Sequence, residues 1–183
     1  MSMEENSKQE SHRLVGCVKK FLESNKLQYT YDDERSLFSF PFLLTHGHKI
    51  LETGIYEVFA HSTDITIHCY ALPKFGKGES VLKTDSEEVM FRVMKYFSLV
   101  NWCNPDGSFV IHFATGQIRY QLQHYCRETD DTPSLETINN IMFLPSIAWE
   151  DYGDGLLDVM FRDVNPFKSA YDALQSKGFY GDD

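Results

Sequence analysis

Seven histidines are the first residues in this 183-residue chain whose type suits metal binding or acid–base chemistry. His46 and His48 flank a single glycine, and His61 and His68 lie in a predicted hairpin further along the chain. A zinc site needs three or four ligands in tetrahedral geometry, oriented by neighbouring groups. Because an HxH pair around a glycine is more typical of a polar turn, we predict no metal site and no bound cofactor.

Cysteine chemistry requires a thiol beside an activating group. His68 and Cys69 are adjacent in the sequence, and neighbours on a strand face opposite sides of a sheet, so they cannot pair directly. His124 and Cys126 share a strand face but lie roughly 7 Å apart along it. The chain has no CxxC spacing, which predicts small buried thiols in a reducing compartment such as a bacterial cytoplasm, at Cys17, Cys69, Cys103 and Cys126.

Carboxylates gather late in the sequence, at Glu150, Asp151, Asp154 and Asp158. Their spacing differs from that of an EF-hand loop, and no glutamate stands at its twelfth position. We interpret them as a solvated acidic surface, with a paired-carboxylate hydrolase as the less favoured alternative. The chain also lacks a GxxxxGKS/T phosphate loop and a GxSxG elbow, so that only a Ser/His/Asp triad assembled by the fold stays open. We therefore predict that the protein is not an enzyme.

The formal net charge of −10 argues against nucleic-acid binding, because it repels a phosphate polyanion and no Lys/Arg stripe offsets it. Hydrophobic residues make up 42% of the chain, which is enough for a core. No apolar run approaches the roughly 20 residues of a membrane span, so no membrane contact is predicted. We predict a disordered segment at 1–10, a single α+β domain at 11–177 and an acidic tail at 178–183.

The spacing of apolar residues predicts the helices and strands that must position these groups. Thr84 or Asp85 is expected to cap one helix and Thr132 another, and Pro145 is expected to kink or break the latter. Pro41 cannot donate to a strand ladder, which places its strand at a sheet edge or breaks it. Helices are predicted at 11–25, at 84–100, from 132 and at 166–175, and strands at 28–31, 36–44, 50–60 and 65–72, the last two forming a hairpin.

A second hairpin is predicted around a two-residue loop at Thr115 and Gly116. A one-residue slip would move every side chain to the other face, so the agreement between register and pattern supports it. His112, Arg119 and Gln121 share its polar face. On its apolar face the predicted pairs are Phe109–Leu122, Ile111–Tyr120 and Phe113–Ile118. Local hairpins without regular strand–helix–strand alternation predict an α+β fold, with helices packed on one face of an antiparallel sheet.

This order of elements and several local motifs resemble the YbjN family, described as bacterial sensory transduction regulators. The motifs are Leu99–Asn104, Gly107–Phe109, Ala114–Tyr120 and Phe143–Ile147, and the resemblance extends over residues 12–160. From Arg162 onward the chain departs from the family pattern. The resemblance implies a fold similar to that of type III secretion chaperones and a chaperone-like or regulatory role with dimerisation. It offers no catalytic residues to carry over.

A protein-interaction module is the leading functional hypothesis, because the chain lacks a catalytic set and is rich in aromatic residues and methionine. The expected partner is another protein, or a second copy in a homodimer. The residues expected to contact it are His112, Arg119, Gln121, Trp102 and Trp149. The alternative hypothesis is a small-molecule-binding domain or an enzyme, which predicts a deep pocket where His68, His112 and Arg119 converge.

Overall fold

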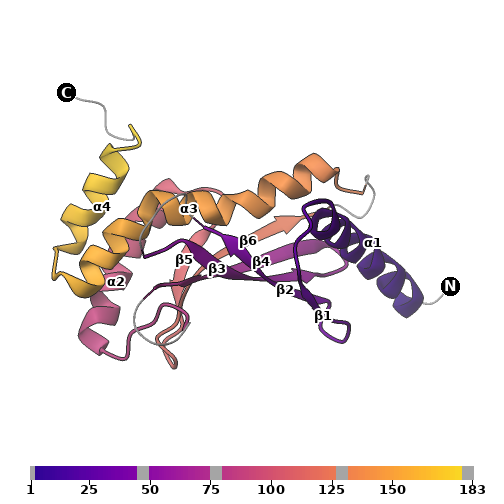
Figure 1. The fold of residues 1–183 in the computed structure, drawn as a ribbon, viewed down its shortest axis with the longest axis horizontal. Coiled ribbons are helices and arrows are strands. Elements are labelled where there is room, and N and C mark those ends of the chain that lie inside the picture. The colour runs from indigo at the N-terminus through magenta and orange to yellow at the C-terminus, as the bar shows by residue number, and fades with distance from the viewer. Residues whose placement is uncertain (1–2, 45–49, 75–79, 127–131, 179–183) are drawn as a thin grey trace.

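The computed structural model describes residues 3–44, 50–74, 80–126 and 132–178. Six antiparallel strands form one sheet in the order β1-β2-β3-β4-β6-β5, with helices along one face (Figure 1). This arrangement confirms the predicted α+β class. In chain order the elements are α1 (Met3–Ser24), β1 (Thr30–Asp32), β2 (Leu37–Leu43), β3 (Thr53–Ala60), β4 (Asp64–Leu72), α2 (Glu87–Val100), the 3₁₀ turn η1 (Asn101–Cys103), β5 (Ser108–Ile111), β6 (Ile118–Tyr125), α3 (Leu135–Phe161) and α4 (Pro166–Gln175).

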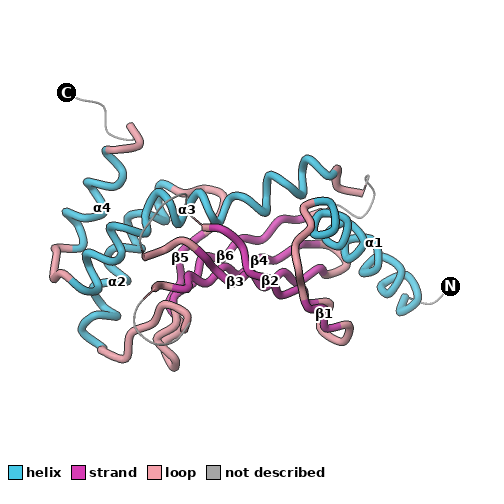
Figure 2. Tube along the Cα trace, viewed as in Figure 1, coloured by secondary structure: helices cyan, strands magenta, loops and turns pink. Residues whose placement is uncertain are grey.

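The longest helix, α3, organises the helical layer. It runs along the sheet and contacts β4 and β6. α1 lies near its N-terminal half, and α2 and α4 pack together at its C-terminal half (Figures 1 and 2). Among the helices of the described residues, none has both the length and the apolar character needed to cross a bilayer.

The hydrophobic core fills the space between the sheet and the helical layer. Side chains alternate along the strands, so that Tyr56, Ile67 and Cys69 are fully buried while their sequence neighbours face the other side of the sheet. The ring centroid of Phe109 lies 5.0 to 6.2 Å from those of four other aromatic rings, Phe97, Tyr120, Trp149 and Tyr152. This cluster joins α2, α3, β5 and β6 at one end of the molecule.

The second hairpin forms, but its predicted register is wrong by two residues. Phe109 pairs with Tyr120, two positions earlier in β6 than predicted. The turn is longer than two residues, because the amide of Gly116 donates to the carbonyl of His112 at 2.7 Å with a φ of 65° at the glycine. A two-residue shift preserves the side-chain faces. Phe109 therefore stays in the core, whereas Phe113 lies in the turn and is 63% exposed.

Helix starts differ from the predictions because of local hydrogen bonding. α2 is capped by Ser86 and not by Thr84 or Asp85, and α3 is capped by Ser134 and not by Thr132. In both helices the serine hydroxyl accepts a hydrogen bond from the amide three residues later, the usual N-cap geometry. α1 extends back into the segment predicted as disordered, which contains glutamate, glutamine and lysine, all good helix formers.

Two prolines test the predictions of strand and helix continuity. β1 pairs with β2 only as far as Ser39, so Pro41 lies where β2 forms the margin of the sheet, as its missing N–H requires. α3 continues through Pro145, so the helix break that was one of the two expected effects of this proline does not occur. The hydroxyl of Ser146 donates to the carbonyl of Phe143 at 2.7 Å in the same turn. Proline is therefore accommodated inside a long, buried helix.

Candidate functional site

The sheet face turned away from α3, which we call the open face, is covered by no helix of the described residues (Figure 2). Five polar side chains project from its centre on three adjacent strands. The strand register places Glu57 of β3 opposite His68 of β4, and His68 opposite Gln121 of β6. Tyr70 and Arg119 occupy the next positions on β4 and β6 on the same face. All five are partly exposed, so they form one continuous polar surface.

These side chains are connected by hydrogen bonds across the strands. The hydroxyl of Tyr70 donates to Oε2 of Glu57 at 3.3 Å. Arg119 donates from Nη1 to that hydroxyl at 3.1 Å and from Nη2 to Oε1 of Gln121 at 3.1 Å. On the other side, Nδ1 of His68 lies 3.9 Å from Oε2 of Glu57. The network therefore runs from His68 through Glu57 and Tyr70 to Arg119 and Gln121.

The network shifts the acidity of two of its members. The interaction with His68, whose Nδ1 lies 3.9 Å from the carboxylate, lowers the pKa of Glu57, although partial burial acts in the opposite direction. Burial raises the pKa of Tyr70, and the hydrogen bond from Arg119 counteracts part of that rise. At neutral pH, Glu57 is therefore a carboxylate and Tyr70 a neutral phenol that both accepts and donates a hydrogen bond.

The two hydrogen-bond partners of Arg119 are both neutral. Its two terminal nitrogens bind a phenol and an amide oxygen, and its Nε is buried without a hydrogen-bond partner. Within the described part of the chain it forms no ion pair. A guanidinium presents donors in a fork that matches a carboxylate. Arg119 thus presents its positive charge at the centre of the open face in a fixed orientation.

An apolar strip borders the polar network on the open face. Pro41 and Ile55 are opposite one another on β2 and β3, and Leu43 and Leu72 flank Thr53 in the next row. Leu43 is 44% exposed, and Ile55 and Leu72 are half-buried. A flat surface that joins apolar side chains to an arginine and a tyrosine has the composition of a protein-binding surface.

Replacing Glu57 with glutamine should make a small, pH-dependent change in stability. At neutral pH we expect Glu57→Gln to lower the free energy of unfolding by less than about 1 kcal/mol, because the carboxylate is partly exposed and screened. The pKa of Glu57 is lower in the folded chain than its ordinary value of 4.5. The carboxylate therefore stabilises the folded chain fully above pH 4.5, and this stabilisation is lost as the pH falls through the pKa of the folded state. Urea unfolding across this range should show the two proteins converging in acid. A difference independent of pH would contradict a role for the charge.

The structure separates the five residues predicted to contact a partner. Arg119 and Gln121 lie together on the open face. His112 is exposed in the hairpin turn, where its Nδ1 lies 3.0 Å from the hydroxyl of Thr115. Trp102 is 89% exposed in η1, whereas Trp149 is 1% exposed and packs in the core.

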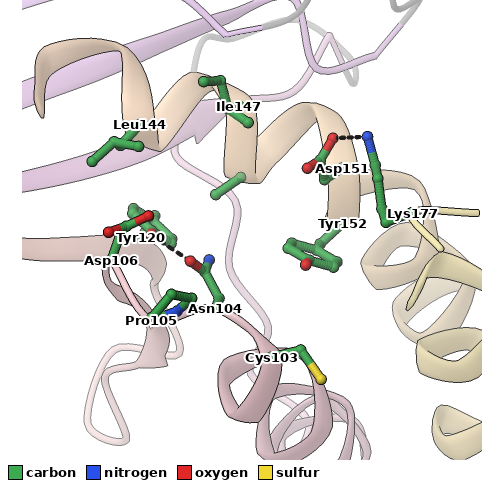
Figure 3. A pocket seen from close by; sticks show the side chains of 11 residues that line it. Cys103, Asn104, Pro105, Asp106, Tyr120, Leu144, Ile147, Asp151, Tyr152 and Lys177 are labelled. Carbon is green, nitrogen blue, oxygen red and sulfur yellow. Dashed lines mark hydrogen bonds and ion pairs between the residues drawn. The ribbon is translucent and has the colours of Figure 1, made fainter. Parts of the chain in front are cut away.

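The pocket predicted by the alternative hypothesis requires three residues to converge. His68 and Arg119 share the open face, but His112 lies apart from them in the turn after β5. The structure does contain a pocket of about 330 Å³ on the helical side of the molecule, between α3, the loop after η1 and Lys177, two residues after the end of α4 (Figure 3). None of the three predicted residues lines it.

The lining of this pocket combines an apolar wall with charged side chains. Asp106 and Asp151 are both part of the lining, and Asp151 forms an ion pair with Lys177 (Figure 3). The hydroxyl of Tyr120 donates to Oδ1 of Asn104 at 3.3 Å. The other lining residues are Cys103, Pro105, Leu144, Ile147, Ala148 and Tyr152. The arrangement offers a concave surface with preorganised polar groups, the usual character of a small-ligand site.

Of the other residues singled out for their chemistry, those that the structure describes do not assemble into a site. His46 and His48 lie outside the described residues. Within the described ranges no three His, Cys, Asp or Glu side chains are grouped as a metal site requires. Cys69 is fully buried, and burial raises its thiol pKa well above the ordinary value, which makes it a poor nucleophile. Asp151 and Asp158 of the acidic run are in ion pairs, with Lys177 and Arg162 respectively.

Sequence reasoning did not identify Glu57, Tyr70 or the pocket. If the predicted strands 50–60 and 65–72 pair from their facing ends, Ala60 with Ile65, then Glu57 stands opposite His68, so the signal for that pair lies in the hairpin register. The sequence also indicates the apolar wall of the pocket, since Leu144, Ile147 and Ala148 have the spacing of residues on one helix face. The two carboxylates come from segments far apart in the sequence, and no local pattern connects them. A scan against models of known protein families finds no match for this chain, and a search of curated proteins finds no significant relative.

Proposed function

We propose that this chain is a non-enzymatic protein-interaction module and that its binding surface is the open face. The observation that carries the proposal is Arg119, a guanidinium held by two neutral partners at the centre of an uncovered sheet face. Arginine and tyrosine are enriched among the residues that contribute most to protein–protein binding. The flat network of side chains suits contact with another protein surface better than enclosure of a substrate.

A second copy of the chain is the partner that the open face fits best. The Tyr70 hydroxyl lies 3.3 Å from the Glu57 carboxylate and 3.1 Å from the Arg119 guanidinium, so the two opposite charges flank one point. A two-fold axis in the plane of the interface that passes near this hydroxyl, at a right angle to the line from Glu57 to Arg119, brings Arg119 of each copy over Glu57 of the other. Symmetric dimers require such a self-complementary patch. The neighbouring apolar strip would be buried in the same contact.

The resemblance to the YbjN family agrees with this proposal. It implies a fold similar to that of the type III secretion chaperones and a chaperone-like or regulatory role in a bacterial cytoplasm. Free cysteines are in keeping with a reducing compartment. On this proposal the chain acts by holding a protein surface, and a dimer is its resting form.

Reversing one charge of the proposed pair should weaken dimerisation. Arg119→Glu and Glu57→Arg each place like charges opposite one another across the interface, and we expect each to raise the dimer dissociation constant by roughly tenfold or more. The double variant restores opposite charges with the wild-type net charge, so it should recover much of the lost affinity. Sedimentation equilibrium over a range of protein concentrations measures all four proteins.

Arg162→Glu serves as the matched control, because it makes the same change in net charge at the exposed end of α3. It should leave the dissociation constant close to that of the wild type. A wild type that stays monomeric at its highest soluble concentration would contradict self-association. A double variant no better than the single ones would contradict the pairing of Arg119 with Glu57.

A further inference from the structure

The pocket beneath α3 is separate from the open face, and we propose that it binds a small organic cation, an amine with an apolar body. The inference does not depend on the proposed dimer, because the pocket lines the opposite side of the sheet from the network of Glu57 and Arg119. It rests on the pocket's size, its rigidity, its apolar wall and the sign of its charge.

The pocket has the size and the fixed shape of a ligand site. Its volume of about 330 Å³ is enough for a small molecule. Asn101 fixes the loop that forms one wall, since its amide side chain donates to the carbonyl of Phe109 at 2.9 Å and accepts from that residue's N–H at 2.8 Å. Asn104 is bound in turn by the hydroxyl of Tyr120. A ligand would therefore meet a wall that is already ordered, and little ordering free energy opposes binding.

The opposite wall is apolar and comes from one helix. Leu144, Ile147 and Ala148 of α3 line the pocket, and Pro105 faces them from the loop (Figure 3). Ile147 is 50% exposed, although it lies in the middle of a long helix. Covering such a side chain with a ligand's hydrocarbon removes apolar surface from water, which is favourable. The ligand is thus expected to carry an apolar body.

The charges of the lining select a cation. Two carboxylates and one ammonium leave a net negative charge, and Asp106 forms no hydrogen bond or ion pair with any described residue. Burial raises the pKa of Tyr120 to about 12, and the nearby charge of Asp106 adds to that rise. Lys177 already places an ammonium against Asp151 at the rim. The lining therefore holds one cation of its own and leaves a second carboxylate for another.

The test compares three probes that differ in charge but share a phenyl ring. Phenethylamine is the cation, 2-phenylethanol its neutral counterpart and phenylacetate an anion. Titration of each into the isotopically labelled full-length chain, followed by amide NMR, gives both an affinity and a location. We expect phenethylamine to shift the signals of Asn104 and Ala148 saturably, with a Kd of about 1 mM or tighter, and the alcohol to bind roughly tenfold more weakly.

Two substitutions connect this binding to named charges. Asp106→Asn should reduce phenethylamine affinity to the level of the alcohol. Lys177→Gln frees the carboxylate of Asp151 and should increase the affinity by several-fold. Glu150→Gln is the matched control. Glu150 is an exposed carboxylate of α3 that does not line the pocket, so this substitution should leave the phenethylamine affinity unchanged.

Each outcome decides the proposal. Equal binding of the amine and the alcohol, tighter binding of phenylacetate, or unchanged amine affinity in Asp106→Asn overturns it. The absence of saturable shifts with phenethylamine in wild type and in Lys177→Gln also overturns it. Selective amine binding that Asp106→Asn removes, with shifts confined to the pocket, supports it and is independent of whether the chain dimerises.

Discussion

Phe109→Ala is expected to lower the free energy of unfolding by about 3–5 kcal/mol, the usual cost of removing a large buried aromatic ring. Phe109 is 2% exposed, and its ring contacts those of Phe97, Tyr120, Trp149 and Tyr152. Deleting it leaves a cavity between α2, α3 and the second hairpin that a rigid sheet cannot fill. Urea unfolding followed by far-ultraviolet circular dichroism measures the change.

Phe113→Ala is the matched control for this prediction. Phe113 stands in the same hairpin, and the sequence alone predicts that it faces the core beside Phe109. In the structure it is 63% exposed in the turn, so we expect a change of less than about 0.5 kcal/mol. Equal losses for the two variants would contradict the observed register and favour the shorter predicted loop.

Gly116→Ala is expected to cost about 3 kcal/mol or more, for two separate reasons. Gly116 has a φ of 65°, a conformation that residues with a side chain rarely adopt. A Cβ added there would also overlap the carbonyl oxygen of Thr84, whose amide donates to the carbonyl of Gly116 at 3.1 Å. Because the overlapping atom belongs to the backbone, no side-chain rotation relieves it.

Gly178→Ala separates the two effects. Gly178 has a similar φ of 73°, but an added Cβ meets nothing within 4 Å. We expect a loss of about 1 kcal/mol, the cost of the backbone conformation alone. Amide hydrogen exchange adds a local readout, since Thr84 should lose protection only in Gly116→Ala. Similar losses in both glycine variants would contradict the close contact of Gly116 with Thr84.

Some of this fold could be predicted from local patterns and some could not. The α4 boundaries at Pro166 and Gln175 agree with the prediction, because a proline start and an apolar stripe act within one segment. The sequence does not show that Trp102 is exposed and Trp149 buried, because both tryptophans have polar and apolar neighbours in the sequence. Trp149 is buried only through the packing of α3 on the sheet.

The candidate sites show the same division. Arg119 and Gln121 were placed correctly on one polar face, because a two-residue error in register leaves the period-two alternation intact. Their link to Glu57 depends on the pairing of β4 with β6, two strands separated in the chain by α2, η1 and β5. Asp106 and Asp151 meet at one pocket only because α3 crosses over the loop after η1. Such long-range contacts leave no periodic signal in the sequence.

The crossing of α3 over both β4 and β6 also has a consequence for how the chain folds. Strands β1 to β4 are joined by pairings between sequence neighbours, and β5 and β6 by another such pairing, which gives two locally formed units. Among the named strands of the described residues, one pairing, β4 with β6, joins them, and it requires closure of a long loop that costs entropy before it gains contacts. α3 follows both units in the sequence and contacts both sides of that junction. The junction therefore gains its contacts with α3 only after all six strands have been synthesised, so a nascent chain stopped before α3 would hold two halves joined by one strand pairing.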